Sequence, residues 1–199
     1  MSKLLREFHG LQYDRSTIVE ARKEATAVVV SALLQRADAR NQNGRVYPRH
    51  ILEREVQNYS KAIEEGRATG ELDHPESSVV NLSNVSHILR KIWWQGDDVM
   101  GEVEILTTPK GKIALELMEA GVKLGISSRG VGETSKNEEG DEVVEEDFML
   151  VAFDLVSEPS THEAWLMREG REISVDNVRE LVSKNDRINR AVNEILRSK

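Results

Sequence analysis

The sequence contains no cysteine among its 199 residues. This absence excludes disulfide bonds, thiol nucleophiles and thiolate metal ligands, and it is typical of proteins in a reducing compartment. Any nucleophile must therefore be an oxygen or a nitrogen atom. No apolar run reaches the roughly 18 residues that a transmembrane helix needs, and the N-terminus turns polar too early for a secretory signal.

Positive charge is also scarce. The chain has 27 Lys and Arg against 35 Asp and Glu, a net charge of −8, and no basic run. We therefore expect neither nucleic acid nor a membrane as a direct partner. There is no His-x-x-x-His pair, no phosphate loop and no dinucleotide fingerprint, so we expect no metal and no cofactor.

The hydrophobic and turn patterns predict an α+β domain. The predicted elements are a strand within 25–41, a helix over 47–66, two strands within 83–106, a helix over 108–121, a strand over 122–132, an exposed hairpin loop over 133–142 and a long strand over 143–160. This order mixes strands and helices without strict alternation. It favours a mixed or antiparallel, barrel-like sheet with flanking helices.

Both ends of the chain differ from this central region. Residues 1–24 are charged, with scattered apolar residues, and are predicted to be a loosely attached leader or propeptide with a helix near 16–24. Residues 25–166 form the predicted main domain. Within 167–199, an amphipathic helix over 174–198 repeats its apolar positions about every seven residues. It either packs on its own domain or serves as an interaction or docking segment, and we favour the second.

The motif GISSRG, at residues 125–130, offers a candidate nucleophile. Alternate side chains of a strand point to opposite faces, so Ser127 shares a face with Gly125 and Arg129. Ser128 lies on the other, apolar face. The glycine leaves space for a substrate, and Arg129 is placed to supply positive charge near a developing oxyanion. The alternative is a polar strand end that runs into a glycine-rich turn.

Two further residues complete a candidate Ser/His/Asp set. Asp154 interrupts the apolar run FMLVAFDLV, where a carboxylate is unfavourable unless it is paired. His74 is held in an extended conformation by Pro75, and a neutral imidazole can take a proton from a serine hydroxyl while an aspartate fixes its tautomer. Equally, Asp154 could be a strand-end residue bonded to backbone amides or to an arginine, and His74 a loop residue.

The other four histidines are weaker candidates. His9 lies in the leader and His50 in the first turn of a helix, while His162 follows a turn. His87 alternates with apolar residues along a predicted strand, so we expect it in or near the core.

The chain resembles the prohead core maturation proteases of myovirus-type tailed phages, which are distantly similar to herpesvirus assembly proteases. The residues that carry the resemblance are NQNGRVYPRHILEREV (41–56), GELDHP (70–75), IWWQGDDVMGEVEIL (92–106), AGVKLGISSRG (120–130) and FDLVSEPSTHEAW (153–165). They occur in the order of the family and at similar spacing. Their combination is more specific than any single motif.

The resemblance implies a serine endopeptidase with a herpesvirus-protease-like fold. It implies His74 as the general base, Ser127 as the nucleophile and Asp154 as the third member of the set. The alternatives to Asp154 are the neighbouring acids Asp73, Glu71 and Glu158. It also implies Arg129 for oxyanion stabilisation or substrate binding, and we add its neighbours Ser128 and Gly130 to that group.

The resemblance further implies a biological setting. Such enzymes cleave scaffold or core proteins and the major capsid protein inside the viral prohead, in the host cytoplasm, and we expect a homo-oligomer. They tend to cut after glutamate and to remove their own N-terminal segment, so Glu7 and Glu20 are candidate autocleavage sites. Arg129, Arg90 or Lys91 is a candidate to bind the substrate carboxylate.

An alternative function belongs to a different class. The chain could be a non-catalytic, scaffold-associated or tube-like phage assembly protein on the same fold. The joint presence of His74, Ser127 and Asp154 favours the enzyme.

Overall fold

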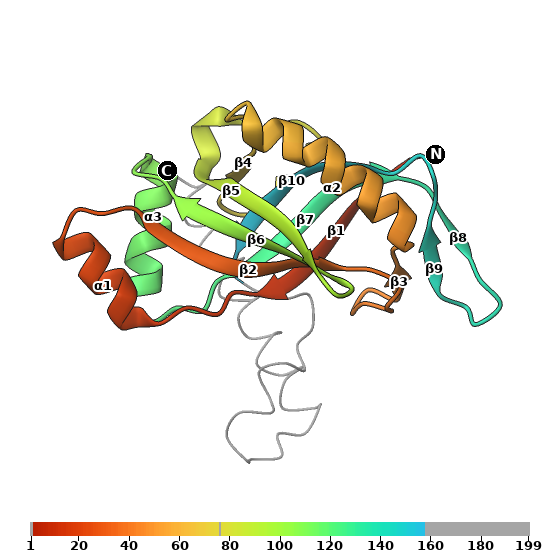
Figure 1. Cartoon of the computed structure of the whole chain (residues 1–199), viewed down its shortest axis with the longest axis horizontal. Helices are drawn as coiled ribbons and strands as arrows, with labels where there is room; N and C mark the ends of the chain where they lie inside the picture. The colour runs from red at the N-terminus through yellow and green to blue at the C-terminus, as the bar shows by residue number, and fades with distance from the viewer. Residues whose placement is uncertain (1, 76, 158–199) are drawn as a thin grey trace, which may run out of the picture. The chain divides into compact units, whose positions relative to one another are not determined.

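The structure, a computed structural model, describes residues 2–75 and 77–157 (Figure 1). The predicted C-terminal helix over 174–198, Glu158 and His162 lie outside the described residues. The strands are β1 (Lys3–Gly10), β2 (Val28–Arg36), β3 (Arg45–Val46), β4 (Thr69–Glu71), β5 (Val85–Gln95), β6 (Asp98–Ile105), β7 (Gly125–Gly132), β8 (Thr134–Lys136), β9 (Glu142–Val144) and β10 (Met149–Val156). The helices are α1 (Arg15–Lys23), α2 (Arg49–Glu64), α3 (Pro109–Glu119) and the 3-10 turn η1 (Leu82–Asn84).

The strands form three sheets. The first has the order β1-β7-β10, the second β2-β6-β5-β4 and the third β3-β9-β8. Every pairing between these strands is antiparallel except that of β3 with β9. The first two sheets meet where β4 continues into Leu72, which forms a parallel bridge with Leu155 of β10. The predicted α+β class with a mixed, mainly antiparallel sheet is confirmed.

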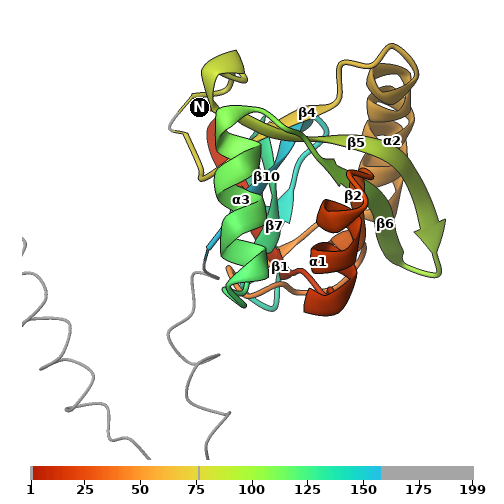
Figure 2. The same cartoon turned by 90° about the vertical axis from the view of Figure 1, so that its left-hand side faces the viewer.

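One hydrophobic core lies between the first two sheets. Figures 1 and 2 show β2, β6 and β5 on one side of it and β1, β7 and β10 on the other. Both sheets contribute fully buried residues to this core, among them Leu34, Leu89, Val103, Ile126, Phe153 and Leu155. Because β7 is the middle strand of its sheet, a side chain on its other face is held by neighbours on both sides.

The two predicted central helices are present as α2 and α3, each slightly shorter than predicted. In α3, Thr108 is the N-cap and accepts a hydrogen bond from the Gly111 amide, and Pro109 is the first helical residue. In α2 the buried residues Ile51, Leu52, Val56 and Tyr59 make the predicted apolar face. Helices α1 and α3 pack against each other at one end of the strands, facing the viewer in Figure 2.

The N-terminal leader is not loosely attached as predicted. Residues 3–10 form β1, which pairs with β7 along its whole length. The apolar Leu5 and the charged Glu7 of β1 are both buried. The Glu7 carboxylate accepts hydrogen bonds from Arg45 and Tyr47 at 2.7 and 2.9 Å. These distant partners are the physical reason why a strand with so many charges is stable in the sheet. The predicted helix that follows is confirmed as α1.

The predicted long strand over 143–160 is also wrong in part. Residues 142–144 pair with β8 as β9, and a turn separates them from β10. The turn is closed by a hydrogen bond from the Phe148 amide to the Glu145 carbonyl. The acidic residues 145–147 are therefore at a turn, where they stay in contact with solvent.

Candidate active site

Ser127 lies in the middle of the first sheet. It is paired with Asp154 of β10 on one side and with Phe8 of β1 on the other. Directly paired residues of an antiparallel ladder project to the same face, so Ser127 and Asp154 are brought together by strand register alone. Only 2% of Ser127 is exposed.

His74 reaches this face by a sharp change in chain direction. Leu72 runs beside β10, and the Asp73 amide donates a hydrogen bond to the Leu155 carbonyl at 2.7 Å. Asp73 then adopts a positive φ of 71°, a conformation that aspartate tolerates better than most residues. The turn brings the imidazole of His74 back over the sheet.

A glycine makes this approach possible. A Cβ atom at Gly70 would lie 2.0 Å from the Phe153 carbonyl oxygen and 2.3 Å from Nε2 of His87. No side chain fits there, so only glycine lets β4 come so close to β10. The first residue of the GELDHP motif therefore controls how near His74 comes to Asp154.

The three candidate catalytic side chains form one hydrogen-bonded chain. Nε2 of His74 lies 2.6 Å from Oγ of Ser127, and Nδ1 lies 3.1 Å from Oδ2 of Asp154. An ionised carboxylate only accepts hydrogen bonds, so Nδ1 carries the proton and Nε2 is free to accept one from the serine. This is the geometry of an activated serine nucleophile.

The environment of Asp154 favours its charged form. It is fully buried, and burial alone would raise its pKa, but the hydrogen bond from His74 and the charge of Arg129 lower the pKa below its ordinary value of 3.8. The Glu71 amide also donates to Oδ1 at 3.1 Å. The carboxylate is thus ionised near neutral pH.

Arg129 shares the Ser127 face as predicted, but its side chain does not reach out toward a substrate. Its guanidinium is fully buried and donates to both carboxylate oxygens of Asp154, at 2.8 and 3.1 Å. It also pairs with Glu71 at 3.1 Å. The positive charge of Arg129 is therefore paired with the buried carboxylates of Asp154 and Glu71.

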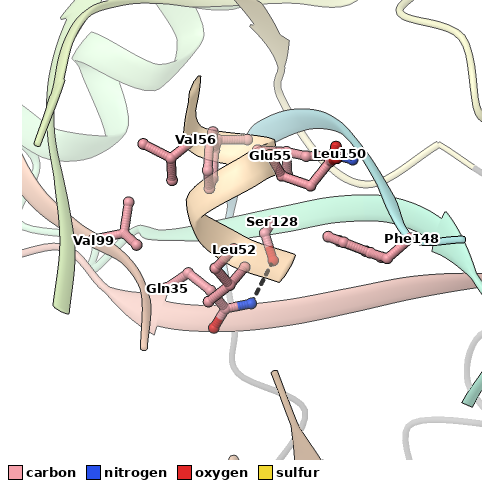
Figure 3. Close-up of a pocket in the computed structure, with 9 residues that line it drawn as sticks. Gln35, Leu52, Glu55, Val56, Val99, Ser128, Phe148 and Leu150 are labelled. Atoms are coloured by element: carbon pink, nitrogen blue, oxygen red, sulfur yellow. Dashed lines mark hydrogen bonds between the residues drawn. The ribbon is translucent and has the colours of Figure 1, made fainter. Parts of the chain in front are cut away.

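Ser128 and Gly130 lie on the opposite face of β7. Oγ of Ser128 accepts a hydrogen bond from Nε2 of Gln35 at 3.2 Å, and it lines a cavity of about 10 Å³ beside Glu55 (Figure 3). Gly130 is covered by the ring of Phe148, which a Cβ atom would meet at 2.3 Å. The side-chain alternation predicted for 125–130 is confirmed, and the two residues lie on the core side.

The space beside Ser127 that Gly125 was expected to leave for a substrate is filled. A Cβ atom at Gly125 would meet the ring of Phe8 at 1.9 Å. Because Phe8 belongs to β1, the N-terminal segment contributes to the surroundings of the candidate nucleophile.

Three further histidines are described, and no hydrogen bond joins them to Ser127. His9 of β1 pairs with Ile126 in the strand register, and its Nε2 lies 3.4 Å from Oε1 of Gln35. His87 is fully buried as expected, and burial lowers its pKa to about 4. Its Nε2 lies 2.8 Å from the Phe153 carbonyl and its Nδ1 lies 2.9 Å from Oγ of Ser86. A carbonyl only accepts hydrogen bonds, so Nε2 carries the proton. His50 is exposed beside Glu146.

Glu71, an alternative to Asp154 as the acid that orients His74, instead places its carboxylate against Arg129. It is fully buried and contacts both Arg129 and, through its amide, Asp154. A glutamate three residues before a candidate base was the available signal, but its partner lies 58 residues further along the chain.

The described part of the chain shows neither a metal-binding cluster nor a helix that could span a membrane. Residues 2–75 and 77–157 contain no group of three or more His, Asp or Glu side chains arranged to hold a metal ion. The helices within these ranges are too short or too polar to span a membrane.

Comparison with known proteins gives consistent matches. A family model described as prohead core protein serine protease matches residues 19–177. The prohead core protein protease of Enterobacteria phage T4 is 34% identical over 142 residues, covering 69% of this chain and 66%, just under two thirds, of that relative. The solved structure of the bacteriophage T4 capsid assembly protease, gp21, superposes with a TM-score of 0.68 at 27% identity, covering 79% of this chain and 99% of that one.

Proposed function

The chain belongs to the prohead core protein serine protease family, and we propose that it is a serine endopeptidase with Ser127, His74 and Asp154 as its catalytic residues. The observation that carries this proposal is the position of one imidazole, 2.6 Å from the serine oxygen and 3.1 Å from the buried carboxylate. An orienting acid, a base and a hydroxyl in that order are the parts that acyl transfer needs.

The proposed reaction follows from this order. The Ser127 oxygen attacks the carbonyl carbon of a peptide bond while its proton passes to Nε2 of His74. The C–N bond then breaks, the leaving amine takes that proton, and an acyl-enzyme remains. Water repeats the two steps, which releases the new carboxylate and restores the serine. Asp154 holds the imidazole and stabilises its positive charge during both attacks.

We propose the substrates and setting by analogy with the relatives. The names of the relatives describe prohead core and capsid assembly proteases, so we propose scaffold or core proteins and the major capsid protein as substrates, inside the phage prohead. Homo-oligomerisation also remains a proposal. We further propose a herpesvirus-protease-like, barrel-like arrangement, which the bridge between Leu72 and Leu155 supports by linking the first two sheets.

Cleavage after glutamate is proposed on the family resemblance. The three basic residues considered for binding the substrate carboxylate already have acidic partners: Arg129 pairs with Asp154 and Glu71, Arg90 with Glu104 and Lys91 with Glu102. With these partners, none of the three basic residues is available to bind a substrate glutamate.

Self-processing is proposed at Glu20 rather than at Glu7. The Glu7 side chain is 1% exposed, and β1 would have to leave the sheet before its backbone entered an active site. Glu20 is exposed on α1. Cleavage there would leave β1 free to stay paired with β7.

The test compares three chains: the wild type, Ser127→Ala and Ser128→Ala. Each is incubated alone and with a Leu-x-Glu peptide, and intact masses are read over time. We expect the wild type and Ser128→Ala to cleave the peptide, while Ser127→Ala leaves it whole. Cleavage by Ser127→Ala at the wild-type rate would contradict the proposed nucleophile. No cleavage by any chain, with that peptide or with a scaffold protein, would favour a non-catalytic assembly protein.

A further inference from the structure

A cluster of three buried charged side chains includes the candidate catalytic residue Asp154. Arg129, Glu71 and Asp154 have side chains that are at most 1% exposed. Arg129 donates from Nε to Oδ2 and from Nη2 to Oδ1 of Asp154, so one guanidinium holds both carboxylate oxygens. A two-point contact of this kind fixes the plane of the carboxylate as well as its position.

The cluster is also tied to the segment that carries His74. The Glu71 amide donates to Oδ1 of Asp154, and Oε1 of Glu71 accepts from the Asn81 amide at 3.0 Å. Nη1 of Arg129 donates to the Ser77 carbonyl at 2.6 Å. The chain is thus anchored to the cluster both before and after His74, so a movement of Arg129 would disturb both ends of this segment.

The charges of the cluster do not cancel. One guanidinium faces two carboxylates, which leaves one net negative charge in a buried place when both carboxylates are ionised. Transfer of the serine proton to His74 would neutralise that charge. In a low-dielectric environment this compensation favours the imidazolium that forms during nucleophilic attack.

We infer that Arg129 and Glu71 are positioning residues of the proposed serine site. Arg129 orients Asp154 toward His74. Glu71 holds Arg129 in place and supplies the second negative charge that favours proton transfer to His74. This inference rests on the proposed function, since it assigns roles within the same site.

Other titratable groups also face the cluster. Tyr59 of α2 and His87 of β5 lie close enough to interact electrostatically with Asp154. Arg6 of β1 is paired with Arg129 in the strand register and donates to the Pro75 carbonyl at 2.7 Å. Asp73 accepts a hydrogen bond from the His74 amide at 2.9 Å. None of these four has an ion pair with a cluster member, so Glu71 is the group to change first.

The test measures serine reactivity instead of proteolysis. A fluorophosphonate probe forms a bond from phosphorus to the Ser127 oxygen, fluoride leaves, and the hydroxyl proton passes to His74. The rate of mass increase is recorded against pH for the wild type, Glu71→Gln and Arg129→Lys. Glutamine keeps the acceptor oxygen of Glu71 but removes its charge. Lysine keeps the charge of Arg129 but loses the two-point contact.

The two variants are expected to differ in kind. In Glu71→Gln the pH of half-maximal rate should move to a lower value, because one of the negative charges that favour proton transfer to the base is removed. In Arg129→Lys the maximal rate should fall at least about tenfold with little movement of that pH, because Asp154 is less well oriented. Rates are taken only on protein that circular dichroism shows to be folded.

Glu55→Gln is the matched control. Glu55 is also a buried glutamate, pairs with Arg54 and accepts a hydrogen bond from the Leu150 amide of β10, but it does not contact Asp154. It should lower thermal stability without changing the pH profile. Two results together would overturn the inference. One is a Glu71→Gln variant that loses thermal stability but keeps the wild-type pH profile, as Glu55→Gln should. The other is an Arg129→Lys variant that keeps the wild-type maximal rate.

A second readout separates this inference from the proposed function. The proton on Nδ1 of His74 gives a low-field NMR resonance, identified by its loss in His74→Gln. We expect this resonance in the wild type and Glu71→Gln, and its shift or loss in Arg129→Lys. If the wild type does not react with the probe, the proposed function fails and the resonance still tests the role of Arg129. An unchanged resonance in Arg129→Lys would overturn that role.

Discussion

The two faces of β7 differ in what the same residue type does on each. Ser127 and Ser128 are adjacent, and each is 2% exposed. The first meets His74 at 2.6 Å, whereas the second meets Gln35 at 3.2 Å on the core side. The two side chains are therefore identical and equally buried, and they differ only in their hydrogen-bond partners. The comparison shows that a serine becomes a candidate nucleophile through its neighbours, which strand alternation selects.

A similar contrast occurs on β10, where two histidines contact neighbouring residues. His87 contacts the Phe153 carbonyl from within the core, and His74 contacts the Asp154 carboxylate at the site. A carbonyl holds a neutral ring in place, whereas a buried carboxylate can also stabilise a charged ring. The predictions below use four variants to test these two contrasts.

The largest effect is expected for Ser127→Ala. Removing the nucleophile of a serine protease lowers kcat by about 10⁶-fold, and we expect a loss of that order in peptide hydrolysis. The measurement is the initial rate on a Leu-x-Glu peptide, with circular dichroism to show that the variant is folded. If a folded Ser127→Ala chain retained a tenth of the wild-type activity, Ser127 would not be the nucleophile.

Asp154→Asn should have the next largest effect. Asparagine has the size of aspartate but only one acceptor oxygen. If Arg129 keeps that oxygen, the amide NH₂ group faces His74. The NH₂ group donates a hydrogen bond to Nδ1, which favours the wrong tautomer of the imidazole. We expect kcat to fall by about 10⁴-fold. Activity within tenfold of the wild type would show that another acid orients the base.

The same variant should alter stability in acid. The pKa of Asp154 is lowered in the folded protein, so its contribution is present above its ordinary pKa of 3.8 and is lost as the pH falls through the folded value. Asp154→Asn should therefore lack that part of the acid sensitivity. Urea unfolding below pH 5 measures it, and parallel curves for both proteins would contradict the pairing.

A smaller effect, on stability rather than rate, is expected for His87→Gln. Burial lowers the pKa of His87 from 6.5 to about 4. Between these two pH values the unfolded state binds a proton that the folded state does not bind. The free energy of unfolding of the wild type should therefore fall by about 3 kcal/mol from pH 6.5 to pH 4 through this group. Glutamine can still donate to the Phe153 carbonyl, so the variant should lose less over that interval.

The control for this prediction is His50→Gln, a change at an exposed histidine. It should leave the free energy of unfolding at neutral pH within about 0.5 kcal/mol of the wild type, as is usual for a change on the surface. Peptidase activity should stay within about tenfold for both variants, because neither histidine contacts Ser127. An unchanged pH dependence in His87→Gln would mean that His87 is protonated in the folded protein.

Local rules predicted the contacts among the candidate catalytic residues better than the contacts that support them. Period-two alternation separated Ser127 from Ser128, and the position of Asp154 in an apolar run indicated a buried partner. The partner of Arg129 was not predictable, because Glu71 comes from a strand of the other sheet. Alternation tells which face a side chain occupies, but not which distant strand covers that face.

Strand β1 was missed for a related reason. Its charged residues hide the apolar alternation, since Glu7 is buried with Arg45 and Tyr47. Sequence patterns assign charged residues to solvent, and this assignment fails when the opposite charge comes from elsewhere in the fold. The contact between the N-terminal segment and the candidate catalytic face of β7 follows only from the pairing of β1 with β7.

The smallest effect is expected for Ser128→Ala, and it tests the contrast most directly. The change removes the acceptor of Gln35 next to a small cavity (Figure 3), so we expect a loss of about 1 to 3 kcal/mol in the free energy of unfolding from the buried, unsatisfied amide. The peptidase rate should stay within about threefold, because the site face is unchanged. A double-mutant cycle with Gln35→Ala should give a coupling energy of at least about 0.5 kcal/mol. A large loss of activity with no loss of stability would mean that the core face of β7 acts on the reaction, and the division of roles between its two serines would be wrong.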